Sequence, residues 1–228
     1  MKLKRFLPLL ALPLLAACAP EVESTIYLAD VQTALDKGET IAVPAMLRIP
    51  QAGEDECKKG LDALVEKLKA LAPVTGKAQC ISRNDSTGQG TQLAEIETKL
   101  QIVASGTEVD PLNLFVIEAA STDEGRTDLT FRMLKPISEV IEALKTDDSM
   151  KVDFDPAKFI VHINNDASGT VEIAGNTVFA DGKPVLPETG GTISLDRRSE
   201  VEIRFSDVAS SYLEQGNSYW FVTVGPAE

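Results

Sequence analysis

The segment Ala94-Glu95-Ile96-Glu97-Thr98-Lys99-Leu100-Gln101-Ile102 alternates between a mainly apolar set of residues and a polar set. Successive side chains of a β-strand point to opposite faces, so this period of two predicts a long strand with one buried and one solvent-exposed face. The same alternation recurs at residues 41–49, 128–133 and 200–205. The chain is therefore expected to be rich in strands.

Two other strand segments carry more specific signals. Residues 114–120 are almost uniformly apolar, which is typical of a strand in the centre of a sheet. Pro44 interrupts the strand predicted at residues 41–49. Because proline cannot donate a ladder hydrogen bond, we expect that strand to lie at an edge or to contain a bulge.

Two segments have the periodicity of amphipathic helices. The first begins with Glu54, Asp55 and Glu56 and stops before Pro73, and the second follows Pro136. Acids in the first turn complement the helix dipole, and proline is favoured at a first helical position. The apolar faces consist of Cys57, Leu61, Leu64, Val65, Leu68 and Leu71 in the first helix and of Ile137, Val140, Ile141 and Leu144 in the second. The predicted fold class is α+β, mostly antiparallel β with two main amphipathic helices.

The domain organisation leaves two alternatives open. From residue 158 onward, short strands are separated by the turn dipeptides Gly175-Asn176 and Asp181-Gly182, which predicts hairpins and a C-terminal β meander. One interpretation is an α+β domain at 25–157 followed by a small β-rich domain at 158–228. In the other, the strand at 158–164 completes the first sheet, and the two parts form one continuous domain.

The first eighteen residues form a targeting segment rather than part of the fold. A basic start is followed by an apolar run from Phe6 to Ala17, which at 12 residues is shorter than the ~20 that a membrane-spanning helix needs. The run ends in Leu15-Ala16-Ala17-Cys18, which resembles the lipobox of bacterial lipoproteins. The resemblance implies that residues 1–17 are a signal peptide that is cut off, and that Cys18 receives a diacylglyceryl group and then further acylation at its new amino terminus.

Lipidation of Cys18 would hold the protein to a membrane through residues 18–24, which we expect to be a short tether. Each buried CH₂ contributes ~0.8 kcal/mol, and one acyl chain binds only reversibly, so two or three chains on one cysteine would anchor the protein stably. The residue after Cys18 is Ala19 rather than Asp. By resemblance to the enterobacterial sorting rule, this favours the outer over the inner membrane of the bacterial envelope.

The charge of the chain excludes two classes of partner. The formal net charge is −13, and removal of the three positive charges in the signal takes it to −16. A chain so acidic is repelled by nucleic acid and by anionic lipid surfaces. We expect membrane contact only through the lipid on Cys18, and an envelope protein as the partner of the soluble part.

The two cysteines that remain after Cys18, Cys57 and Cys80, form an even pair in an oxidising compartment and are expected to form a disulfide. The alternative is two buried free thiols. A metal site is not expected, because His162 is the single histidine and no CxxC spacing occurs. The acidic loop at residues 147–155 lacks the spacing of a calcium-binding loop. No cofactor motif is present.

Candidate catalytic residues are few. His162 lies on a predicted strand without the motif of a nucleophilic hydrolase, and Glu118 interrupts an apolar strand. Aromatic residues are scarce but gather near the C-terminus as Tyr212, Tyr219, Trp220 and Phe221. If the strand at 219–224 alternates regularly, Tyr219 and Phe221 share one face and, with Tyr212, form a candidate partner surface.

Two functions of different class remain. The first is a lipid-anchored envelope lipoprotein with a non-catalytic interaction or scaffolding role. The alternative is a lipid-anchored hydrolase or small-ligand-binding protein whose acidic residues do the chemistry. A concave pocket that gathers acids with perturbed pKa values would favour the alternative, whereas a broad exposed aromatic face would favour the first. We expect the non-catalytic role.

Overall fold

The structure is a computed structural model that describes residues 19–84, 90–144, 157–187 and 191–226. The lipobox with Cys18 and the acidic loop at 147–155 lie outside these residues. The described strands are β1 (Glu21–Tyr27), β2 (Ile41–Gln51), β3 (Ala78–Asn84), β4 (Gly90–Ala104), β5 (Phe115–Ser121), β6 (Thr127–Met133), β7 (Lys158–Asn164), β8 (Val171–Gly175), β9 (Val178–Ala180), β10 (Lys183–Val185), β11 (Thr192–Leu195), β12 (Glu200–Phe205) and β13 (Ser218–Pro226). The described helices are α1 (Leu28–Lys37), α2 (Glu54–Lys69), α3 (Ile137–Leu144) and α4 (Asp207–Glu214). The fold is mixed α and β, with β-structure dominant, as predicted in outline.

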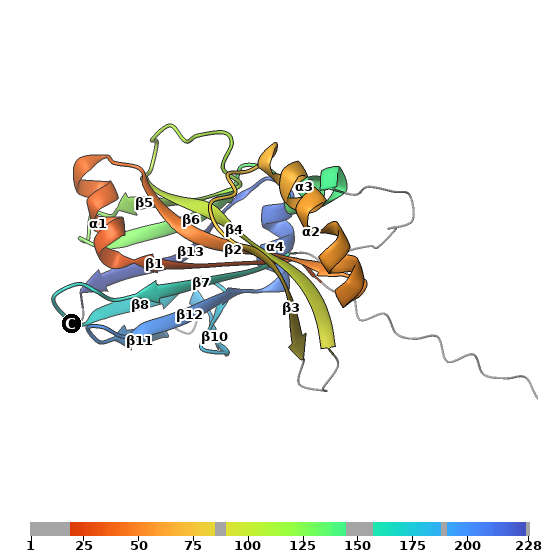
Figure 1. Cartoon of the computed structure of the whole chain (residues 1–228). Coiled ribbons are helices and arrows are strands. Elements are labelled where there is room, and N and C mark those ends of the chain that lie inside the picture. The colour runs from red at the N-terminus through yellow and green to blue at the C-terminus, as the bar shows by residue number, and fades with distance from the viewer. Residues whose placement is uncertain (1–18, 85–89, 145–156, 188–190, 227–228) are drawn as a thin grey trace, which may run out of the picture.

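The strand predicted at 94–102 is the middle of β4, a 15-residue strand at the centre of the sheet. The whole of β2 pairs along one edge of β4. The other edge is divided, because β3 pairs with residues 90–96 and β5 with residues 100–104. One long strand therefore holds together the body of the sheet and the β3–β4 extension that projects from it (Figure 1). The prediction that 114–120 is central is also confirmed, since β5 lies between β4 and β6.

All described strands belong to one sheet, in the order β10-β9-β12-β7-β1-β2-β4-β5-β6-β13-β8-β11, with β3 paired to β4 outside this series. β8 and β9 lie near opposite ends of that order, yet only two residues separate them in the chain. A two-residue connection cannot span an open sheet of this width, so the sheet must curl until its ends meet. A Cβ on Gly175 at the end of β8 would lie 2.8 Å from Val178 of β9 and 3.0 Å from Val185 of β10, which shows how closely the two ends approach.

Phenylalanine side chains fill the interior of the curled sheet. The ring centroids of Phe131 on β6 and Phe159 on β7 are 5.2 Å apart, although four strands separate β6 from β7 in the sheet. Phe205 contacts both rings from β12. Such tilted pairs stabilise by about 0.5–1.5 kcal/mol each beyond their buried area. Figure 1 shows α1 at one end of the sheet and α2 with α3 at the other.

The predicted C-terminal meander is wrong. Among strands β7 to β13, β9 and β10 alone are both consecutive and paired, through the positive-φ turn at Asp181 (φ 47°) and Gly182 (φ 75°). The dipeptide Gly175-Asn176, predicted as a hairpin turn, instead carries the chain from one end of the sheet to the other. Most pairings are antiparallel, as predicted, but β1 with β7 and β4 with β5 are parallel.

Residues from both predicted domains interleave in the sheet. β7 and β12 pair beside β1, and β13 pairs beside β6, so 25–157 and 158–228 contribute strands to one sheet. This arrangement favours the alternative of one continuous domain. The tether predicted at 18–24 is too long, because β1 already begins at Glu21 and the carbonyl oxygen of Pro20 accepts a hydrogen bond from Lys158 N at 2.8 Å.

The prediction that Pro44 marks an edge strand is also wrong, because β2 lies between β1 and β4. The pairing of β1 with β2 ends at Ser24 and Ala45, one residue before Pro44 is reached. Pro44 therefore has no ladder partner on the β1 side that would need its missing N–H group. Its carbonyl oxygen accepts a hydrogen bond from the Ser24 hydroxyl at 2.8 Å.

Candidate interaction surface

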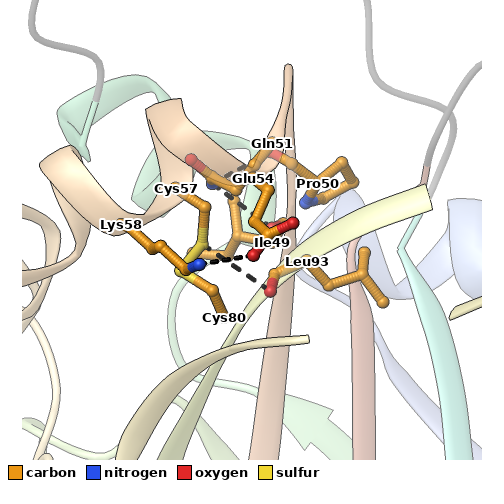
Figure 2. The surroundings of a disulfide bond; sticks show 8 residues. All are labelled: Ile49, Pro50, Gln51, Glu54, Cys57, Lys58, Cys80 and Leu93. Carbon is orange, nitrogen blue, oxygen red and sulfur yellow. Dashed lines mark hydrogen bonds and ion pairs between the residues drawn. A yellow bond between two sulfur atoms is a disulfide. The ribbon is translucent and has the colours of Figure 1, made fainter. Parts of the chain in front are cut away.

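The predicted disulfide joins Cys57, in the first turn of α2, to Cys80 on β3 (Figure 2). The Cα atoms are 6.0 Å apart, and Cys57 is buried. Because β3 pairs only with β4, the bond fixes α2 to the strand extension. Figure 2 shows the bond among residues at the end of β2, at the start of α2 and at Leu93 of β4. We interpret this bond as a structural cross-link.

The aromatic residues predicted as a partner surface fall into different environments. Tyr212 on α4 is 46% exposed, Tyr219 is half-buried, and Phe221 is fully buried in the core. The ladder between β13 and β6 shifts register between Trp220 and Val222. Tyr219 and Phe221 do share one face, but it is the core face, because both rings pack against Phe205, whereas Trp220 is 42% exposed.

We define the α4 surface as Asp207, Val208, Ser211, Tyr212 and Gln215, which line an open hollow of about 370 Å³. The side chain of Ser206 caps the helix by accepting a hydrogen bond from Ala209 N. Leu213 is buried beneath, and Val208 and Tyr212 are one helical turn apart on the outer side. Val208 is 78% exposed. Two large apolar side chains thus lie together in solvent on a capped, well-packed helix.

A second hollow, the Trp220 pocket, lies beside β13 and has a volume of about 490 Å³. Its wall includes Trp220 and Thr223 of β13, Asp123 and Glu124 of the β5–β6 turn, Arg126, and Asp128 of β6. A residue of the α4 surface and one of the Trp220 pocket are neighbours through β13. The Tyr212 and Tyr219 rings are 6.4 Å apart, and Tyr219 precedes Trp220 in the strand.

A charged cluster on the sheet was not foreseen from the sequence. Arg48 of β2 donates to Glu95 of β4 at 2.7 Å and also to Glu21 and Glu23 of β1. Arg48, Glu21 and Glu95 are each only 8% exposed. The face of β4 that the sequence predicted to be solvent-exposed is therefore buried at Glu95, where the neighbouring strand β2 supplies Arg48 as the counter-ion. Opposite charges on adjacent strands are the signal that could have revealed the cluster, but only with the strand order known.

His162 lies at the border of this cluster, between two carboxylates. Its Nε2 is 2.9 Å from Glu23 and its Nδ1 is 3.2 Å from Glu200. Burial raises the pKa of the Glu23 carboxyl, but hydrogen bonds and charges from Arg48 and His162 outweigh burial and leave that pKa below its usual value. His162 thus does lie among acids, but each of its contacts is an ion pair or hydrogen bond within the sheet, and it lines neither of the two hollows described above.

The other acid singled out from the sequence is also satisfied. Glu118 on β5 accepts hydrogen bonds from Nε and Nη2 of Arg132 on the neighbouring β6, at 2.9 and 2.6 Å. This pairing explains how an acid is accommodated within an apolar strand. In the described part of the chain, no group of three or more His, Cys, Asp or Glu side chains is arranged to hold a metal ion.

Comparison with protein families gives one match, to DUF7424, a domain of unknown function, over residues 20–227. The chain therefore belongs to the DUF7424 family, and the family domain begins just before β1. Neither the curated proteins nor the solved structures yielded a match. Within the described residues, the helices are too short or too polar to cross a membrane.

Proposed function

We propose that the chain is an envelope lipoprotein, anchored through acyl chains on Cys18, whose folded domain binds a protein partner without catalysing a reaction. The observation that carries the proposal is the α4 surface. Val208 and Tyr212 present adjacent apolar side chains on a rigid helix, and aromatic anchors of this kind dominate the energetics of protein interfaces. Partner binding would remove both side chains from water.

The position of β1 supports the anchoring part of the proposal. Only Ala19 lies between Cys18 and Pro20, the first residue hydrogen-bonded to the sheet. An extended residue spans at most about 3.6 Å, so acyl chains on Cys18 would keep the domain directly at the bilayer. A partner in the same membrane, or next to it, would then meet the α4 surface at high effective concentration.

The catalytic alternative has less support. The acids that it would use are engaged: Glu118 by Arg132, and Glu23 by Arg48 and His162. The pKa of Glu23 is lowered, whereas a general acid near neutral pH needs a raised one. We therefore retain the non-catalytic role.

The test is site-specific photocrosslinking in intact cells. A photoreactive amino acid placed at Val208 or at Tyr212 should capture the same protein partner. The control position is Ala63, which is exposed on a different helix, α2. Capture of one partner from both α4 positions but not from position 63 supports the proposal. Equal capture from all three, or none from α4, contradicts it.

A further inference from the structure

The Trp220 pocket has the chemistry of a cation-binding site. Three of the side chains that line it are acidic and Arg126 is basic, which leaves a net charge of −2. Trp220 supplies an indole ring, the aromatic side chain that attracts cations most strongly. The indole and the carboxylates favour the same kind of group, an ammonium or guanidinium ion.

The ring of Trp220 is held in place before any ligand arrives. Its Nε1 donates to the carbonyl oxygen of Val222 at 3.1 Å and to the Thr223 hydroxyl at 3.2 Å. The Thr223 hydroxyl in turn donates to Asp128. The polar edge of the indole is thus used within the protein, and its face remains for a ligand. A preorganised ring loses little conformational entropy on binding.

The basic residue of the pocket does not neutralise the acids. The Nε of Arg126 is 3.8 Å from Glu124, whose side chain is 79% exposed. A Cβ on Gly225 would lie 2.9 Å from the Arg126 side-chain stem, so that stem lies against the end of β13. Asp123 is exposed in the turn next to Glu124. A second cation entering the pocket would therefore meet carboxylates that Arg126 leaves uncompensated.

We propose that the Trp220 pocket receives a lysine or arginine side chain of the protein partner that binds the α4 surface. This inference rests on the proposed function. Asn176 links Tyr219, whose ring lies 6.4 Å from that of Tyr212 in the α4 surface, to Trp220 in the pocket. Its carbonyl oxygen accepts from the Tyr219 hydroxyl, and its Nδ2 donates to the carbonyl oxygen of Trp220 at 2.9 Å. One partner can therefore place an apolar patch on α4 and a basic side chain beside Trp220.

Trp220 is the single tryptophan of the chain, so fluorescence excited selectively in tryptophan reports on this pocket. The full-length protein would be titrated with a short peptide containing three lysines, with the same peptide acetylated on every lysine, and with putrescine. We expect a saturable fluorescence change with the lysine peptide only. The double variant Asp123→Asn/Glu124→Gln should bind about tenfold more weakly. The matched control, Asp62→Asn/Glu66→Gln on α2, removes the same charge and should bind as the unchanged protein does.

Several results would overturn the inference: no saturable change, an equal response to the acetylated peptide, or equal weakening in both double variants, which would indicate non-specific attraction. Equal affinity for putrescine would show that the pocket takes a small amine instead of a partner side chain. These failures are distinguishable from failure of the proposed function. If crosslinking from Val208 still captures the partner while the peptide does not bind, only the pocket assignment is wrong.

Discussion

Arg48 lies directly opposite Glu95 in the pairing of β2 with β4, and its Nε donates to the Glu95 carboxylate at 2.7 Å. The same guanidinium contacts Glu21 and Glu23 of β1. One cation therefore holds three acids from two strands on either side of it, at a place where both Arg48 and Glu95 are almost buried.

Replacing Arg48 should be among the most damaging single changes in the sheet. Arg48→Met would leave the buried Glu95 carboxylate without its ion-pair partner, and removing one partner of such a pair costs about 3–5 kcal/mol. The free energy of unfolding, measured by urea denaturation, tests this expectation. The control is Lys58→Met, which breaks an exposed pair with Glu54 and should leave stability unchanged. Equal effects of the two substitutions would contradict the structural role of Arg48.

The same cluster predicts how stability depends on pH. Burial raises the pKa values of the Glu23 and Glu95 carboxyls. Interactions with Arg48, together with His162 at Glu23 and Gln79 at Glu95, outweigh burial and bring both pKa values below the ordinary 4.5. A lowered folded-state pKa stabilises the protein above pH 4.5, and this contribution is lost as the pH falls through the folded-state value. The stability difference between the unchanged protein and Arg48→Met should therefore narrow between pH 7 and about pH 3. A constant difference over that range would show that Arg48 acts through packing alone.

The disulfide should contribute measurably to stability. It closes a loop with a sequence separation of 23, which corresponds to about 3 kcal/mol in the chain-entropy model. Cys57→Ser/Cys80→Ser should lower the free energy of unfolding by about that amount. In the unchanged protein, alkylation without reduction should leave both cysteines unlabelled in a mass spectrum. Labelling of either one would show that the bond is absent in the cell.

The lipid anchor is tested at Cys18. Cys18→Ser should leave an uncleaved or mislocalised precursor, because it removes the thiol that we propose accepts the diacylglyceryl group. Cell fractionation and the mass of the N-terminal peptide measure the outcome. Ala19→Ser, at the neighbouring position, is the control and should be processed normally. A Cys18→Ser protein that is still cleaved and still found with membranes would contradict the lipoprotein assignment.

Local patterns predicted local structure well. The alternation at 94–102 located β4, and the apolar stripe from Cys57 to Leu68 located α2. The pairing of Cys57 with Cys80 followed from cysteine number and compartment. For β4 and α2 the signal and the structure lie within the same short segment of chain, so no knowledge of distant contacts was needed.

Strand order could not be predicted, because it depends on contacts between distant segments. The turn at Gly175 was expected to close a hairpin, but the curled sheet uses it to connect its two ends. The Arg48 cluster exists only once β1, β2 and β4 are neighbours. Phe221 was assigned to the surface because the sequence pattern does not show which face of β13 packs against Phe205 in the core. Each error arose where tertiary contacts decide the outcome.

The central claim, that α4 binds a protein partner, is tested most directly by substituting Val208. Because the Val208 side chain is 78% exposed, Val208→Asp should leave the free energy of unfolding unchanged. The substitution nevertheless places a charge in the middle of the proposed interface. The measurement is recovery of the crosslink-identified partner with the purified protein, compared between the unchanged protein, Val208→Asp and the control Ala63→Asp on α2. The account predicts that recovery falls at least about tenfold for Val208→Asp alone. Equal recovery with all three proteins would contradict it.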